Sequence, residues 1–130
     1  METQAAKDVR ATIEKFRDAV QAGDIKALES VVAHEADMVF YGSQAGDKQV
    51  GWPAIKASFE EQFGETSAIE SEELGSAIKL NGDTAWAAYD LRFTQKGGAG
   101  AGTFETRWTC VLCRYKNGWK VVHMHHSRGR

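Results

Sequence analysis

The sequence has 130 residues, of which 42% are hydrophobic and 26% are charged, and its formal net charge is -2. This length and this balance are typical of one globular domain, predicted over residues 1–130, and argue against a disordered chain. The small negative charge and the scattered basic residues give no reason to expect a nucleic-acid partner, and no apolar run approaches the roughly 20 residues of a membrane helix. Since the N-terminal stretch METQAAKDVR is polar, a cytoplasmic location is expected.

The N-terminal half shows the periodicity of amphipathic helices. One stripe over residues 6–20 has apolar side chains spaced by three and four positions, namely Val9, Ile13, Phe16 and Val20. Gly23 is expected to end this helix, and Asp24 is expected to cap a second, short one. A third helix is expected to open at residues 51–53 (Gly-Trp-Pro), because proline suits the first turn of a helix.

The C-terminal half changes to the period of strands, from about Thr66 onward. Beyond a short β-prone run in ADMVFYGS, long strands are predicted over 68–80, 84–95, 103–116 and 119–127. Residues 81–83 and 116–118 are typical hairpin turns, and the glycine-rich stretch between 96 and 102 is interpreted as a flexible hairpin loop. Helices followed by an antiparallel meander predict a segregated α+β fold, with the helices on one face of a curved sheet and a cavity at the mouth of the cone.

The cysteines and the C-terminal histidines are the residues to consider as metal ligands. Cys110 and Cys113 form a C-x-x-C string within a predicted strand, where residues three apart point to opposite faces. The two sulfurs therefore diverge, and free structural thiols are expected. His123 and His125 share a strand face and His126 points to the other, while no spacing in the sequence supplies a third and a fourth ligand. No metal site and no cofactor are predicted.

Several segments together resemble the SnoaL-like branch of the NTF2-like superfamily. They are the helix ending in AGD, the strand ADMVFYG, the helix GWPAIKASFEEQF and the terminal GWKVVHMHHS. Within that superfamily, AYDLRFTQ at 88–95 and FETRWTCVLCRYKNGWKVVHMHHSRG at 104–129 are similar to the association (hub) domain of calcium/calmodulin-dependent protein kinase II. The resemblance implies an NTF2-like (cystatin-like) cone, a ligand pocket, and a homodimer or a ring of dimers formed through the sheets.

The hub resemblance also implies that arginines line the pocket. Arg92 in LRFTQ and Arg107 in ETRW match pocket arginines of the hub domain, and His126 replaces a third. Because guanidinium groups are costly to bury without an anionic partner, two of them in one cavity would bind a carboxylate or a phosphate. The alternative is that Arg92 pairs with Asp90 or a neighbouring strand, and Arg107 with Glu105, as surface ion pairs.

Aromatic side chains are numerous for this length, and Tyr41, Trp52 and Tyr89 are predicted to form walls of the pocket. Some strands also carry apolar residues on both faces, as Trp86 and Ala88 show between 84 and 94. A sheet covered by helices on one side should be mostly polar on the other. The extra apolar surface therefore predicts self-association of at least two copies.

An enzymatic role depends on whether the pocket holds an acid or a base. Ketosteroid isomerases share this fold, but the position resembling their tyrosine is Phe16, and the position resembling their aspartate falls at Tyr41 or Gly42. Their mechanism is therefore not expected, and a different acid–base chemistry through Asp37, Tyr41 or a histidine is the alternative.

Three functions follow from this sequence. The leading one is a homo-oligomer with a small-molecule pocket in which Arg92, Arg107 and His126 recognise an acidic ligand. The second is an isomerase, dehydratase or hydrolase that uses the same cavity through residues that the sequence does not identify. The third is a structural oligomerisation module.

Overall fold

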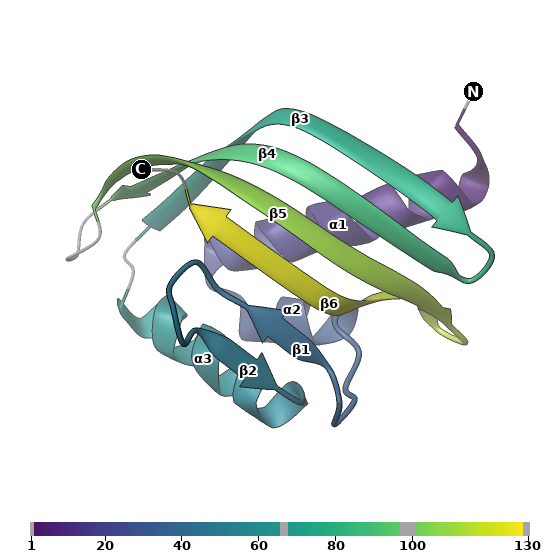
Figure 1. The fold of residues 1–130 in the computed structure, drawn as a ribbon, viewed down its shortest axis with the longest axis horizontal. Helices are drawn as coiled ribbons and strands as arrows, with labels where there is room; N and C mark the ends of the chain where they lie inside the picture. Colours follow the sequence, from purple (N-terminus) through teal and green to yellow (C-terminus); the bar gives the residue numbers. More distant parts are fainter. Residues whose placement is uncertain (1, 66–67, 97–100, 129–130) are drawn as a thin grey trace.

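The computed structural model describes residues 2–65, 68–96 and 101–128. The elements, in chain order, are α1 (Gln4–Ala22), α2 (Ile25–Val31), β1 (Val39–Tyr41), β2 (Lys48–Val50), α3 (Trp52–Glu65), β3 (Ala68–Asn81), β4 (Thr84–Lys96), β5 (Gly102–Tyr115) and β6 (Gly118–Arg128). The strands form one six-stranded sheet in the order β2-β1-β6-β5-β4-β3 (Figure 1). The predicted glycine-rich loop includes residues 97–100, which lie outside the described residues.

The sheet is mixed rather than purely antiparallel, because β1 runs parallel to β6. The long strands β3 to β6 form the predicted antiparallel meander. The short strand β2 was not predicted, since Lys48-Gln49-Val50 has only one apolar residue and its strand conformation comes from pairing with β1. The chain thus places its first strand beside its last one, with β2 at the edge of the sheet, which no local pattern reveals.

Both predicted signals at the end of the first helix are confirmed. Gly23 ends α1 with φ 66°, a left-handed conformation that glycine adopts without steric cost. Asp24 then caps α2, and its carboxylate accepts a hydrogen bond from the backbone N–H of Ala27 at 3.1 Å. The predicted apolar stripe of α1 is buried, with Ala19 added: Val9, Ile13, Phe16, Ala19 and Val20.

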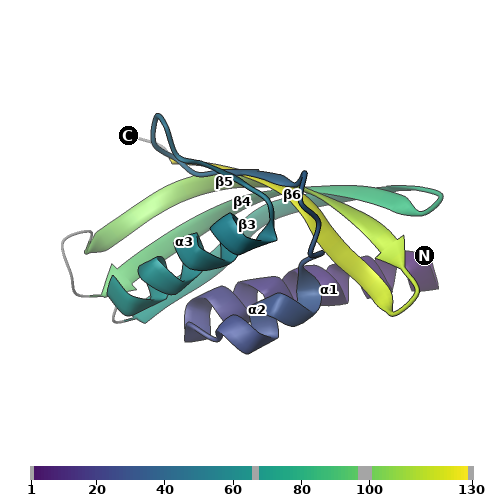
Figure 2. The same ribbon diagram turned by 90° about the horizontal axis from the view of Figure 1, so that it is seen from below.

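The three helices lie on one side of the curved sheet, which we call the inner side (Figure 2). Strand alternation determines which side chains face them: in β4, Ala85, Ala87, Tyr89 and Leu91 are buried, and in β5, Thr106, Trp108, Cys110 and Leu112 are buried. A β-bulge between Val111 and Leu112 shifts the pairing of β5 with β6. His123 and His125 nevertheless share the outer face, as predicted, because they pair with Val111 and Thr109, while His126 pairs with the inward Trp108.

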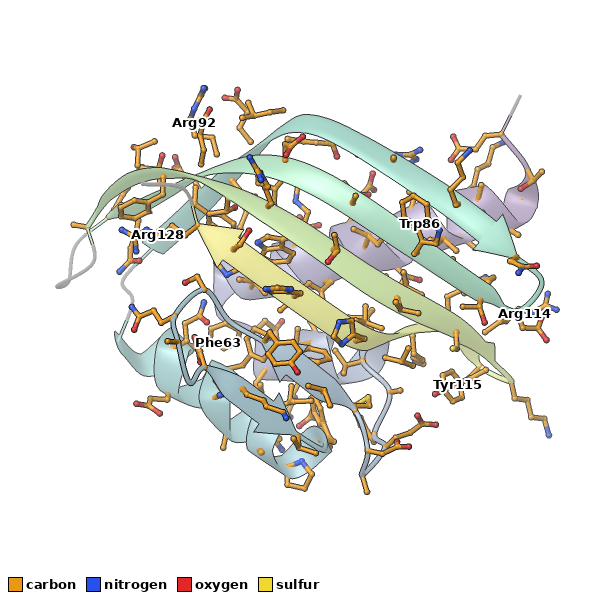
Figure 3. The ribbon with its side chains drawn as sticks, in the orientation of Figure 1. Phe63, Trp86, Arg92, Arg114, Tyr115 and Arg128 are labelled. Carbon is orange, nitrogen blue, oxygen red and sulfur yellow. The ribbon has the colours of Figure 1, made fainter. Side chains whose placement is uncertain are left out.

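The opposite, outer face of the sheet carries the apolar side chains that the helices leave uncovered. Tyr41, Val50, Leu74 and Trp86 are the exposed large hydrophobic residues of the described chain, at 40%, 51%, 43% and 49% exposure. Trp86 projects from β4 (Figure 3), where its neighbours in sequence point into the core.

Cys110 and Cys113 are free, as predicted. None of the described helices has the length and apolar character needed to cross a membrane.

Candidate functional site: a cavity on the inner face of the sheet

A cavity of about 250 Å³ lies between the inner face of the sheet, helix α3 and the hairpin that joins β1 to β2. This volume exceeds the ~150 Å³ of an engineered apolar cavity that binds benzene, so a substituted ring fits within it. Its walls are largely aromatic: Phe40, Phe59, Phe93, Phe104 and Trp108. Its polar lining includes Asp47, Gln49, Ser58, Gln62, Gln95, Thr106, His126 and Arg128. An aromatic cavity with a few polar groups is the usual form of a small-molecule site.

The register of β5 with β6 sets the polar side of the cavity. Thr106 pairs with Arg128, and Trp108 pairs with His126. Paired residues in an antiparallel ladder project from the same face, and residues two apart on one strand do so too. Four side chains that differ in chemistry are therefore placed next to one another on the inner face.

Three of these side chains hold polar atoms that are buried and unsatisfied. Oγ1 of Thr106, Nε1 of Trp108 and Nε2 of His126 have no hydrogen-bond partner among the described residues. A buried polar atom without a partner costs about 1–3 kcal/mol, so native proteins rarely keep one. All three residues line the same cavity, so a polar group bound there lies close to atoms that lack a partner.

His126 is a neutral imidazole at neutral pH. Its burial lowers its pKa to about 4, although the nearby Asp47 carboxylate acts in the opposite direction. Its ring packs against the rings of Trp108 and Phe93, with centroids 5.5 Å and 6.1 Å away. The side chain can donate or accept one hydrogen bond in the cavity, but it does not supply a positive charge there.

Two charged side chains also line the cavity. Asp47 is half-buried in the β1–β2 hairpin, and among the described residues the one side-chain hydrogen bond its carboxylate accepts is a long one, 3.5 Å from Nε2 of Gln49. Arg128 lies at the end of β6, with its guanidinium carbon 3.5 Å from the centre of the Phe104 ring. Figure 3 shows Arg128 at this end of the sheet.

The structure does not bring the two predicted pocket arginines to this cavity. Arg92 lies on the outer face, as Figure 3 shows, where it forms ion pairs with Glu72 and Glu105, both at 3.5 Å. Arg107 is exposed on the same face and does not line the cavity; it lines a second hollow with Asp90, which adjoins the cavity at Thr106 and Arg128. The physical reason is strand alternation, because Leu91 and Trp108 point inward and their neighbours must point outward. Of the surface pairings considered as the alternative, only that of Arg92 with neighbouring strands is found.

The predicted aromatic walls lie elsewhere as well. Tyr41 is on the outer face, next to the rings of His123 and His125. Trp52 stacks on His34 at 4.4 Å near the start of α3. Tyr89 is buried beneath α1, and this burial raises its pKa to about 12. Of the predicted ligand-binding residues, His126 alone lines the cavity.

Sequence reasoning missed Asp47, Thr106, Trp108 and Arg128 as cavity residues. Arg128 could have been found, because it lies two positions after His126 on the same strand and so shares its face. Asp47 could not have been found, because its place beside the cavity depends on pairing between strands that are distant in sequence.

Asp37, the carboxylate considered for acid–base chemistry, is exposed and does not line the cavity. Over 2–65, 68–96 and 101–128, no three His, Cys, Asp or Glu side chains are grouped to hold a metal ion.

Comparison with known proteins agrees with this geometry. The sequence model of the SnoaL-like domain matches residues 9–129. An NTF2-like family protein from Streptomyces avermitilis, described as a candidate dehydratase, has a TM-score of 0.87 at 17% identity and 97% coverage of both chains. An NTF2-like protein of unknown function from Pseudomonas putida KT2440 has a TM-score of 0.83 at 26% identity, with 98% of this chain and 88% of that chain covered. A candidate ketosteroid isomerase from Shewanella frigidimarina has a TM-score of 0.76 at 18% identity, with 90% and 92% covered.

No functionally curated protein matches the sequence. The structural likenesses extend over nearly the whole chain at low identity, so they describe its fold and not its chemistry. The predicted NTF2-like α+β fold is confirmed, and another neighbour, from Caulobacter vibrioides, is described as having a cystatin-like fold. The closer similarity to the kinase association domain stays a prediction.

Proposed function

Because the chain belongs to the SnoaL-like domain family, we propose that it is a small-molecule-binding protein, active as a homodimer in the cytoplasm, whose cavity takes a small organic acid. The observation that carries this proposal is the cluster of three buried, unpartnered polar atoms on Thr106, Trp108 and His126. A ligand oxygen placed among them would accept hydrogen bonds from the Trp108 N–H and the Thr106 hydroxyl, which the protein itself leaves unused. The aromatic walls would bury the ligand's ring or chain.

The charge of the ligand is argued from Arg128. It replaces Arg92 and Arg107 in the sequence-based hypothesis, because it is the arginine that lines the cavity. Its guanidinium carbon lies over the centre of the Phe104 ring. No carboxylate of the described residues pairs with its N–H groups, so they can bind the carboxylate of a ligand. The N–H of Trp108 and the hydroxyl of Thr106 are neutral donors that favour an oxygen acceptor.

Binding is tested by thermal shift with benzoate and related small carboxylates. A ligand at about 100 times its dissociation constant stabilises the native state by about 2.7 kcal/mol, which raises the melting temperature by several degrees. Arg128→Gln and Trp108→Phe should reduce the shift, whereas Arg107→Gln, on the outer face, should leave it unchanged. If no carboxylate stabilises the wild type, or if only Arg107→Gln abolishes the shift, the cavity is not the acid-binding site.

A second candidate function is acid–base catalysis in the same cavity. It is favoured by Asp47, a carboxylate near the neutral His126, and by neighbours described as a candidate dehydratase and a candidate isomerase. Asp47 would accept a proton from carbon next to a carbonyl, and the electron pair would move to the carbonyl oxygen, held by Trp108 and Thr106. Deuterium exchange into phenylacetone, followed by NMR, tests this step. Exchange that Asp47→Asn does not slow would exclude Asp47 as the base.

Self-association is proposed through the outer face of the sheet. This face holds all four exposed large hydrophobic residues of the described chain. Asp90 and Arg107 are also opposite each other there, and neither forms an ion pair among the described residues. A two-fold contact is reciprocal, so one unpaired acid and one unpaired base side by side suit a second copy of the same surface.

The oligomeric state is measured by light scattering on the purified protein. Trp86→Glu should convert the dimer to a monomer, and Ala57→Glu, which adds the same charge on the exposed side of α3, should not. A wild type that is monomeric at high concentration would refute the dimer. A dimer that binds no carboxylate and catalyses no exchange would support the remaining alternative, a structural module.

A further inference from the structure

We infer that the ligand is an aromatic acid that also carries a hydrogen-bond donor, a hydroxyl or an amine, held between Arg128 and Asp47. This inference rests on the proposed function and narrows it to one chemical class. It is based on two opposite charges that line one cavity without pairing with each other.

Asp47 is held in place by its own hairpin. Its backbone carbonyl accepts a hydrogen bond from the N–H of Gly42 at 2.8 Å, and its side chain packs over the Gly42 backbone. A Cβ added at Gly42 would overlap the Asp47 carboxylate, so the carboxylate occupies space that only glycine leaves open. No lysine, arginine or histidine among the described residues lies within ion-pair distance of it.

Arg128 approaches the cavity from a different element. It follows His126 by two positions on β6 and pairs with Thr106 of β5. Among the described residues its side chain contacts the Phe104 ring, and none of their carboxylates forms an ion pair with it. The two charges are therefore presented from the β1–β2 hairpin and from the end of β6, with the aromatic walls forming the rest of the cavity.

An acid without a hydrogen-bond donor would bind Arg128 favourably but not Asp47. Its carboxylate would bind Arg128, but it would also raise the negative charge in a cavity that already contains Asp47. A hydroxyl or an amine on the same molecule would donate to the Asp47 carboxylate and turn this opposition into attraction. The aromatic side chains Phe93 and Trp108, stacked on each other at 5.7 Å, favour a flat ring between the two polar groups.

Isothermal titration calorimetry on the full chain tests the inference. The probes are benzoate, meta- and para-hydroxybenzoate, meta-aminobenzoate, and phenol, which has the donor without the acid. A hydrogen bond to a charged group corresponds to about tenfold or more in affinity, so at least one substituted benzoate should bind that much more tightly than benzoate. Phenol should bind more weakly than benzoate and more weakly than the substituted benzoates.

The variants divide the two contributions. Asp47→Ala should remove the advantage of the substituted acids to within about twofold, while benzoate binds as before or more tightly. Gly42→Ala should reduce the same advantage by displacing the carboxylate without removing its charge. Arg128→Gln should weaken every acid and leave phenol unchanged. Arg114→Gln, in an exposed ion pair with Asp83 and outside the cavity lining, is the matched control, and the melting temperature of each variant shows that it is folded.

Different results would refute the acid-binding cavity and the hydrogen bond from the ligand to Asp47. If benzoate and the substituted benzoates bind the wild type equally, or if Asp47→Ala keeps the advantage of the substituted acids, this inference is refuted and the acid-binding cavity stands. If none of the acids binds, both are refuted. If phenol alone binds, the cavity takes neutral ligands and the role of Arg128 is wrong.

Discussion

Replacing Thr106 with valine should stabilise the free protein while weakening its ligand binding. Thr106 is 5% exposed and its hydroxyl has no partner among the described residues, so folding removes that group from water without compensation. Valine has the same shape and suits a strand. The substitution removes a penalty of about 1–3 kcal/mol, and the melting temperature should rise by about 3–4 °C for each kcal/mol.

The assay is thermal and urea denaturation of the ligand-free protein, with Thr109→Val as the matched control. Thr109 lies on the same strand three positions later, but it is exposed on the outer face. It therefore reports the effect of valine on strand preference alone. Thr106→Val should raise the free energy of unfolding more than Thr109→Val does. Thr106→Val should also lose affinity for a cavity ligand.

A loss of stability in Thr106→Val would refute the reasoning. It would mean that the hydroxyl has a partner in the free protein, and that the three unsatisfied atoms do not mark a ligand site. Gain of stability with unchanged ligand affinity would separate the two arguments: the hydroxyl would be buried at a cost, but the ligand would not contact it.

Further predictions concern pH, the outer face and the core. Because the folded-state pKa of His126 is about 4, below the usual value near 6.5, the unfolded chain binds more protons between these values, and stability should fall as pH falls through that window. The loss should reach about 3 kcal/mol in denaturation curves, His126→Gln should remove most of it, and the exposed His125→Gln should not. Trp86→Glu should shift light scattering from dimer to monomer without lowering the stability of the isolated chain by more than about 0.5 kcal/mol. Leu91→Ala, at a fully buried position, should cost about 2–5 kcal/mol in urea unfolding, whereas Arg92→Gln, in exposed ion pairs, should cost at most about 1 kcal/mol.

Local patterns in the sequence determined most of the fold. The spacing of Val9, Ile13 and Phe16 predicts α1 because a helix returns to the same face every three to four residues. Gly23 and Asp24 mark the boundary between α1 and α2 through their own backbone and side-chain chemistry. The turns and the alternation of the long strands likewise depend on neighbouring residues, and the predicted hairpins are present.

The alternation of residues along the strands also predicts on which face each arginine lies, which the family resemblance did not predict correctly for Arg92. Leu91 is buried on the inner face, and the next residue along a strand points to the other side. Arg92 therefore had to lie opposite the face that the helices cover, and the structure places it there. The same parity, applied to His126, identifies Arg128 as the inward cation.

Only the tertiary structure decided which of these residues form a site. The parallel pairing of β1 with β6 brings the hairpin containing Asp47 to the cavity, although nearly eighty residues separate it from His126 in the chain. Such pairing depends on packing between distant segments, and no periodicity within either one encodes it. The sequence alone thus determined which side of each strand a residue occupies, whereas the assembled sheet and helices determined that Asp47, Thr106, Trp108, His126 and Arg128 share one cavity.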